Sequence, residues 1–159
     1  MAVVKIILIM CLLMVFYQDM KERMVYWFLF PIIAICSGIL LYNNMLTEVF
    51  KTTVMINLVF VVFLITVVFA YSKLKLKTSI TQTFGLGDML LFFALAFTFS
   101  SVSFLILFVF GLIFSLVLHL FLKNKSSHQN VPLAGYLSLF FAIVYISHWT
   151  GILKSVYTI

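Results

Sequence analysis

Two aspartates stand beside long apolar segments, and their carboxyl groups are the side chains best suited to chemistry. Asp19 follows the first apolar segment, and Asp88 opens a later one that has no further charge up to residue 99. A carboxylate at the edge of a membrane-buried helix is costly, so it is interpreted first as functional. The alternatives are a helix-capping role for Asp88 and, for Asp19, a solvated charge paired with Lys21 or Arg23.

Two carboxyl groups that share one water molecule can hydrolyse a peptide bond. One accepts a proton from the water as it attacks the carbonyl carbon, and the other protonates or polarises the carbonyl oxygen. Two like charges at close range disfavour double ionisation, so such a pair holds one proton and titrates as a unit. In this scheme the roles of Asp19 and Asp88 are exchangeable, and we expect no metal and no cofactor.

Two glycines precede the second acid, in the sequence Gly85-Leu86-Gly87-Asp88. Glycine permits unusual backbone torsion angles and lets another chain come close. We therefore expect Gly85 and Gly87 to shape the turn before Asp88. We also expect them to let an extended substrate peptide lie alongside and form strand-like hydrogen bonds.

The composition indicates a multi-pass membrane protein. Of 159 residues, 65% are hydrophobic and only 9% are charged, which is more apolar surface than a soluble domain of this length needs. Ten basic residues outnumber four acidic ones, but they lie in short clusters between apolar runs, as in membrane topology rather than nucleic-acid binding. We expect one membrane-embedded domain over residues 1–159, with the lipid bilayer and no nucleic acid as a partner. The oligomeric state is left open.

Six apolar runs predict an all-α fold with six transmembrane helices. They are Ala2–Tyr17, Val25–Tyr42, Thr52–Tyr71, Leu86–Phe99, Val102–Leu122 and Val131–Trp149. The stretch from 90 to 122 is too long for one span of about 20 residues, so we expect a reversal at the serines near residue 100. Asn57, inside the third run, is expected to hydrogen-bond a neighbouring helix rather than a substrate.

The basic residues predict the orientation of these spans. Seven fall in loops on one side of the membrane and three on the other; the seven are Lys21, Arg23, Lys73, Lys75, Lys77, Lys123 and Lys125. The positive-inside rule places these three basic loops in the cytoplasm and both termini on the extracytoplasmic side. Asp19 and Asp88 then lie at similar depth on the cytoplasmic face, where they can meet.

Together these features resemble the type IV prepilin peptidases, which belong to the GxGD membrane aspartyl proteases and include the archaeal preflagellin peptidases. The resemblance covers essentially the whole chain. It rests on Asp19 after the first run, on Gly85-x-Gly87-Asp88 opening the fourth, and on Pro132 opening the sixth.

The sequence around the two acids matches the family pattern in part. After Asp19, the residues Lys21, Arg23 and Val25 agree with the pattern, whereas Tyr-Trp at 26–27 replaces the family's Pro-Asn. Two positions after the second acid, Leu90 stands where the family often has lysine. These departures concern the handling of the substrate more than the acid pair.

The resemblance implies an aspartic endopeptidase of the inner membrane, with Asp19 and Asp88 as its catalytic residues and its active site facing the cytoplasm. Its partner would be a membrane-tethered prepilin or pseudopilin precursor, from which it removes a short basic leader. Gly85, Gly87 and Pro132 would support the site. Many bacterial members also N-methylate the new terminus, using extra spans and paired CxxC motifs. This sequence has neither, so methyltransferase activity is not expected.

Two other interpretations remain open. A Gly-Leu-Gly-Asp sequence also occurs in the signal-peptide-peptidase and presenilin branch, but those chains are longer and carry Pro-Ala-Leu, whereas residues 132–134 read Pro-Leu-Ala. A different class is a non-catalytic membrane protein, such as an assembly factor or small transporter. There Asp19 and Asp88 would serve as ion or partner sites.

Overall fold

Within the part of the chain that the structure describes, six α-helices follow the six apolar runs. The computed structural model describes residues 1–76, 85–122, 132–153 and 156–157, and within these ranges all regular structure is helical. The elements are α1 (Ala2–Glu22), α2 (Leu29–Tyr42), α3 (Thr47–Tyr71), the π-helical turn η1 (Ser72–Leu76), α5 (Leu86–Leu95), α6 (Ser101–Leu122) and α7 (Leu133–Trp149). The expected all-α fold and the reversal near residue 100 are confirmed.

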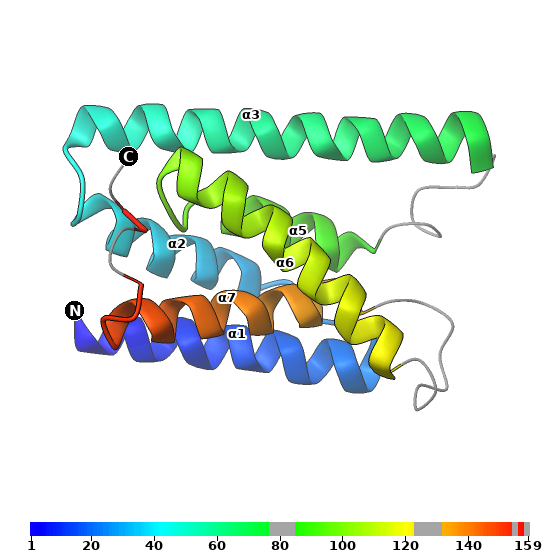
Figure 1. The fold of residues 1–159 in the computed structure, drawn as a ribbon, viewed down its shortest axis with the longest axis horizontal. Helices are drawn as coiled ribbons and strands as arrows, with labels where there is room; N and C mark the ends of the chain where they lie inside the picture. The colour runs from blue at the N-terminus through cyan, green and yellow to red at the C-terminus, as the bar shows by residue number, and fades with distance from the viewer. Residues whose placement is uncertain (77–84, 123–131, 154–155, 158–159) are drawn as a thin grey trace.

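The helices alternate in direction. α1, α3 and α6 run one way along the bundle, and α2, α5 and α7 run back (Figure 1). Contacts at both ends of α1 agree, because Lys5 Nζ lies 5.0 Å from the ring centroid of Trp149 and Asp19 lies against Gly135. Both aspartates therefore lie at the same end of the bundle, which we call the acid end.

Among the described residues, three helices are long and apolar enough to cross a membrane, by length and composition. These spans cover Ala2–Glu22, Thr47–Leu74 and Ser101–Leu122. The other three apolar helices are shorter, and α5 has only 10 residues. At 1.5 Å per residue α5 reaches about 15 Å, half of a hydrocarbon core about 30 Å thick. Three helices thus have the length and composition expected of membrane spans. That all six helices cross the membrane stays a prediction.

The helix boundaries differ from the expected ones at several ends. α1 continues past Tyr17 to Glu22, and α3 begins at Thr47 instead of Thr52. The apolar runs do not include these helix turns, because charged residues at helix ends can be stabilised by the helix dipole. The basic Lys21 lies in the last turn of α1, and the acidic Glu48 lies in the first turn of α3. As a result Asp19 is part of α1 and has a fixed direction, instead of lying in the loop beyond it.

Helix α3 buries only a narrow stripe of side chains and exposes apolar side chains on its other faces. Only Thr53, Asn57 and Val61 are buried, and they form one stripe with a spacing of four residues. Several large apolar side chains on its other faces are exposed, including Phe63 at 63%. An all-round apolar helix of this kind suits a lipid environment.

The seam between α1 and α7 is the most extensive helix contact among the described residues. Leu8, Leu12 and Val15 lie three or four residues apart on α1 and are fully buried, as are Leu137 and Phe141 on α7. Close packing of this kind tolerates little displacement. The seam therefore fixes where the last turn of α1 meets the first turn of α7.

Asn57 anchors the turn between α5 and α6 to α3. Its side chain is fully buried, and Nδ2 donates to the carbonyl oxygens of Ala96 and Phe99 over 2.9 and 3.1 Å. Those carbonyls lie outside a helix, so they need a donor from elsewhere in the fold. Asn57 was expected to bond a neighbouring helix; its partners lie instead in the turn that follows α5.

Replacement of this donor, Asn57→Leu, is expected to lower the free energy of unfolding by about 1–3 kcal/mol, because two buried carbonyls lose their amide partner. The loss is measured as a fall in melting temperature in detergent micelles. The control is Thr66→Ala on the same helix, where an exposed hydroxyl bonds only the carbonyl of Val62. Equal melting temperatures for both variants would contradict the anchoring role.

Candidate active site

Asp19 is buried in the last turn of α1. Its side chain is 8% exposed, and Oδ2 accepts a hydrogen bond of 2.6 Å from the backbone amide of Gly135. A negative charge at the C-terminus of a helix is disfavoured by the helix dipole. The amide from α7 supplies the compensation that α1 does not. Asp19 is thus neither solvent-exposed nor held by its own helix.

Asp88 is half-buried in the first turn of α5. Its Oδ1 accepts a hydrogen bond of 2.7 Å from the backbone amide of Ala134. The backbone amide of Gly85, the N-cap residue of α5, donates a further hydrogen bond to this carboxyl group. Asp88 therefore caps its own helix, as the alternative interpretation expected, and also reaches across to α7.

The two carboxyl groups meet at the N-terminus of α7. Ala134 and Gly135 are consecutive, so Asp88 and Asp19 accept from neighbouring peptide groups, and the two acids interact electrostatically. The two amide nitrogens are one residue apart, and each lies within hydrogen-bond distance of its acceptor. The two accepting carboxyl oxygens therefore lie within about 9 Å of each other. The first amides of a helix lack intrahelical partners and favour negative charge, so this end of α7 suits an acid pair.

Gly135 allows this close approach. A Cβ atom built on it would lie 3.1 Å from Asp19 Oδ2, 3.2 Å from Asp19 Cβ and 3.4 Å from the carbonyl oxygen of Phe16. Only a residue without a side chain lets the α7 backbone touch the last turn of α1 at this point. Gly135 was not among the residues expected at the site, although a glycine three residues after Pro132 was a visible signal.

The two glycines before Asp88 act differently from the expectation. Gly85 has φ −66° and ψ 142°, an extended conformation that any residue adopts, so unusual torsion angles are not the reason for it. Its lack of a side chain matters instead, because a Cβ there would lie 3.1 Å from Asp88 Oδ2. A Cβ on Gly87 would make an ordinary contact of 3.7 Å with Phe30. A side chain at Gly85 would therefore crowd the Asp88 carboxyl group, whereas one at Gly87 would not.

Pro132 is the buried N-cap residue of α7. Its carbonyl oxygen accepts a hydrogen bond of 3.1 Å from the amide of Tyr136, which closes the first turn of the helix. Proline lacks an amide hydrogen, so its place before the helix leaves no buried donor unpaired. Pro132 thus serves the site by starting the helix whose next amides hold the two acids.

Gln18, which the sequence analysis did not assign, shapes the chain just beyond the first acid. Its side chain is 9% exposed, and Oε1 accepts a hydrogen bond of 3.2 Å from the amide of Tyr26. Tyr26 and Trp27, at the positions of the family's Pro-Asn, are 59% and 72% exposed. The departure from the family pattern therefore lies on the exposed side of this loop.

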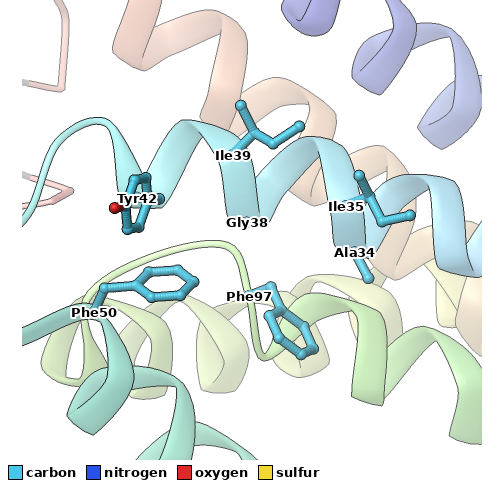
Figure 2. Close-up of a pocket in the computed structure, with 7 residues that line it drawn as sticks. All are labelled: Ala34, Ile35, Gly38, Ile39, Tyr42, Phe50 and Phe97. Atoms are coloured by element: carbon cyan, nitrogen blue, oxygen red, sulfur yellow. The ribbon is translucent and has the colours of Figure 1, made fainter. Parts of the chain in front are cut away.

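A separate apolar groove of about 400 Å³ lies away from the acids. Figure 2 shows Phe50 of α3 and Phe97 of the α5–α6 turn facing the side of α2 that carries Ala34 and Gly38. Every residue that lines it is apolar apart from the hydroxyl of Tyr42. The groove lacks the polar groups that chemistry needs, and neither aspartate lines it.

No family model, curated protein or solved structure matches this chain. The resemblance to the prepilin peptidases therefore stays a prediction from the sequence pattern. The meeting of Asp19 and Asp88 on two neighbouring amides is an observation that does not depend on it.

Proposed function

We propose that this protein is a membrane aspartic endopeptidase that removes the leader from prepilin-like or pseudopilin precursors. The observation that carries the proposal is the pair of hydrogen bonds from Ala134 to Asp88 and from Gly135 to Asp19. They bring two acids that are far apart in the sequence to one helix terminus. The family resemblance adds the substrate class.

The proposed reaction uses the acid pair and one water molecule. A carboxylate offers about four acceptor positions, so one or two amide hydrogen bonds leave room for a shared water. The ionised acid takes a proton from this water as the oxygen attacks the scissile carbonyl carbon, and the protonated acid donates to the carbonyl oxygen. When the tetrahedral intermediate breaks down, the proton taken from water passes to the leaving amine, and a hydroxyl of the intermediate returns a proton to the other acid, so the pair again holds one proton.

The proposed site faces the cytoplasm. The acid end is also the end at which helices α1, α3 and α6 finish, and the basic loops follow these helices in the sequence. The positive-inside rule assigns such loops to the cytoplasm and both termini to the other side, and the family resemblance adds the inner membrane. In this arrangement α2, α5 and α7 also cross the membrane, which makes six crossings with α1, α3 and α6. The basic leader of the substrate approaches the acids from the cytoplasm.

The test is leader removal in cells that lack a prepilin peptidase of their own. Co-expression of this protein with a tagged prepilin-like substrate is expected to yield the shortened product, identified by its mass and N-terminal sequence. Glu22→Gln serves as the matched control, because Glu22 shares the last turn of α1 but is exposed. It is expected to cleave within about twofold of the unmodified protein, as surface substitutions usually have small effects. Loss of cleavage in this control would contradict the assignment of Asp19.

A purely structural role is the second candidate, and one observation favours it. Both acids accept hydrogen bonds from the first turn of α7, and Asp88 also caps α5, as capping residues do in proteins without catalysis. The two candidates differ in what asparagine does at these positions. Its side-chain oxygen also accepts an amide hydrogen bond, but it takes no part in proton transfer.

A further inference from the structure

The connection between α1 and α2 carries a group of exposed apolar side chains at the acid end. Residues 24–28, which we call the aromatic loop, include four of them: Met24, Tyr26, Trp27 and Phe28. The rings of Tyr26 and Phe28 stack, with centroids 5.5 Å apart and an interplanar angle of 15°. The next two residues, Leu29 and Phe30, are buried at the start of α2. The exposure of the loop therefore follows from its place in the fold and not from its residue types.

The aromatic loop lies beside the last turns of α1. The backbone amide of Tyr26 donates a hydrogen bond of 3.2 Å to Oε1 of Gln18, the residue before Asp19. The amide of Leu29 donates to the carbonyl oxygen of Tyr26 over 3.1 Å, which closes the loop onto α2. The loop is thus tied to both flanking helices, and its middle lies at the level of the acid pair.

Helix α1 has the length of one membrane crossing, and aromatic side chains lie near both of its ends. From Ala2 to Glu22 it rises about 30 Å, which is the thickness of a hydrocarbon core. Near its start, Lys5 Nζ lies 5.0 Å from the ring centroid of Trp149. Tryptophan and tyrosine concentrate at the boundary between hydrocarbon and headgroups, because their rings are apolar and their N–H or O–H groups can still bond water. Trp149 and the aromatic loop have the positions expected of two such belts.

The short connection also limits what the aromatic loop can contact. Residues 23–28 must return the chain to α2, so they rise at most about 10 Å beyond the helix ends. The headgroup region is about 5–8 Å thick on each side of a bilayer, so the side chains of the loop stay in or next to it. Lys21 agrees with this depth, because it is exposed and its Nζ lies 5.5 Å from the ring of the exposed Tyr17. Lysine side chains at membrane boundaries lie along apolar surface in this way and keep the charge in water.

We propose that the aromatic loop is a membrane-contact surface that lies among the lipid headgroups and sets the depth of the acid pair in the bilayer. Its partner is a lipid surface, because a loop tied to a membrane-length helix cannot hold its apolar side chains far from lipid. The contact surface rests on the membrane placement of the bundle and not on the proposed function. For the proposed hydrolysis, this depth gives the acid pair water without opening the hydrocarbon core.

The two tryptophans of the sequence allow the depth to be measured. Trp149→Phe leaves Trp27, which is 72% exposed, as the single fluorescent reporter. This protein is reconstituted in phosphatidylcholine vesicles whose lipids carry a nitroxide either near the headgroup or near the end of the acyl chain. We expect the shallow nitroxide to quench Trp27 at least about twofold more strongly than the deep one, because interfacial tryptophan lies at headgroup level. Iodide dissolved in the water is expected to quench it less than the shallow nitroxide does.

Phe63→Trp, in a chain that also carries Trp27→Phe and Trp149→Phe, is the matched control. Phe63 is 63% exposed well inside α3, so the deep nitroxide is expected to quench this reporter more strongly than the shallow one. Melting temperatures in the same vesicles confirm that both proteins are folded.

Two results would overturn the inference. Quenching of Trp27 in the same order as the control would place the acid end inside the hydrocarbon core. Quenching by iodide with none from either lipid would leave the aromatic loop in water or free for another partner. If lipid quenching were missing in the control as well, the membrane placement would be wrong together with the inference. These measurements use no substrate, so a failure to cleave prepilin-like precursors contradicts the proposed function alone.

Discussion

Replacement of either acid by its amide, Asp19→Asn or Asp88→Asn, is expected to abolish leader cleavage while the protein stays folded. Each change removes a group that must exchange a proton in the reaction, and such groups contribute about 10²- to 10⁴-fold to the rate. Because the two acids act as one unit, a single replacement is expected to lower the rate by about 10³-fold or more. The measurement is the fraction of co-expressed precursor converted to the shortened product.

The fold is expected to survive because asparagine preserves the hydrogen bonds that hold α7. Its side-chain oxygen accepts from the amides of Gly135 or Ala134 as the carboxylate does, and asparagine caps helices as well as aspartate. The Asn variants should therefore melt within a few degrees of the unmodified protein. Asp88→Ala is the contrasting variant, because it leaves the Ala134 amide without this acceptor and should destabilise by about 1–3 kcal/mol.

Two outcomes would contradict the acid pair. Full processing by Asp19→Asn or by Asp88→Asn would show that the missing carboxyl group is not needed for hydrolysis. Loss of cleavage together with loss of the folded protein in both Asn variants would instead favour the structural role of the acids at the start of α7.

Gly135→Ala is expected to have the second-largest effect. The added Cβ would lie 3.1–3.2 Å from two atoms of Asp19 and 3.4 Å from the backbone oxygen of Phe16, so a rotamer change of Asp19 does not relieve the crowding. α1 and α7 must then separate slightly along their close-packed seam. Overpacking of this kind typically costs about 1–3 kcal/mol.

The same separation moves Asp19 away from Asp88. A misplacement of about 1 Å at a catalytic group can lower the rate by about 10²-fold, so the loss of cleavage should exceed what the loss of stability explains. Cleavage is therefore measured per folded molecule, using membranes held well below the melting temperature of the variant.

Gly38→Ala is the matched control for this effect. It is the same substitution inside α2, where the new Cβ would make an ordinary contact of 3.8 Å with Phe97. Alanine also has the higher helix propensity, so Gly38→Ala should fold at least as well as the unmodified protein and cleave normally. Equal cleavage by the Gly135→Ala and Gly38→Ala variants would show that the approach of α7 to Asp19 does not matter.

The distribution of apolar residues predicted most of the helical architecture. Long apolar runs indicate helices without any knowledge of tertiary contacts, because a chain in lipid must satisfy its backbone hydrogen bonds internally. The alternation of basic loops predicted that Asp19 and Asp88 share one end of the bundle. The ends of α1 and α3 were placed wrongly, since polar residues such as Glu22 and Glu48 continue a helix as readily as apolar ones.

The sequence by itself identified the candidate residues of the site, which are two acids, a glycine pair and a proline at the start of the last helix. It also predicted that all of them lie on one side of the membrane. Only the tertiary structure decided that backbone amides of α7 hold both acids, and that Gly135 lets α7 approach Asp19 closely. The physical reason is that these contacts join residues 46 and 116 positions apart. A backbone amide leaves no signature in the sequence, and its value to a distant carboxylate arises only when the helices pack.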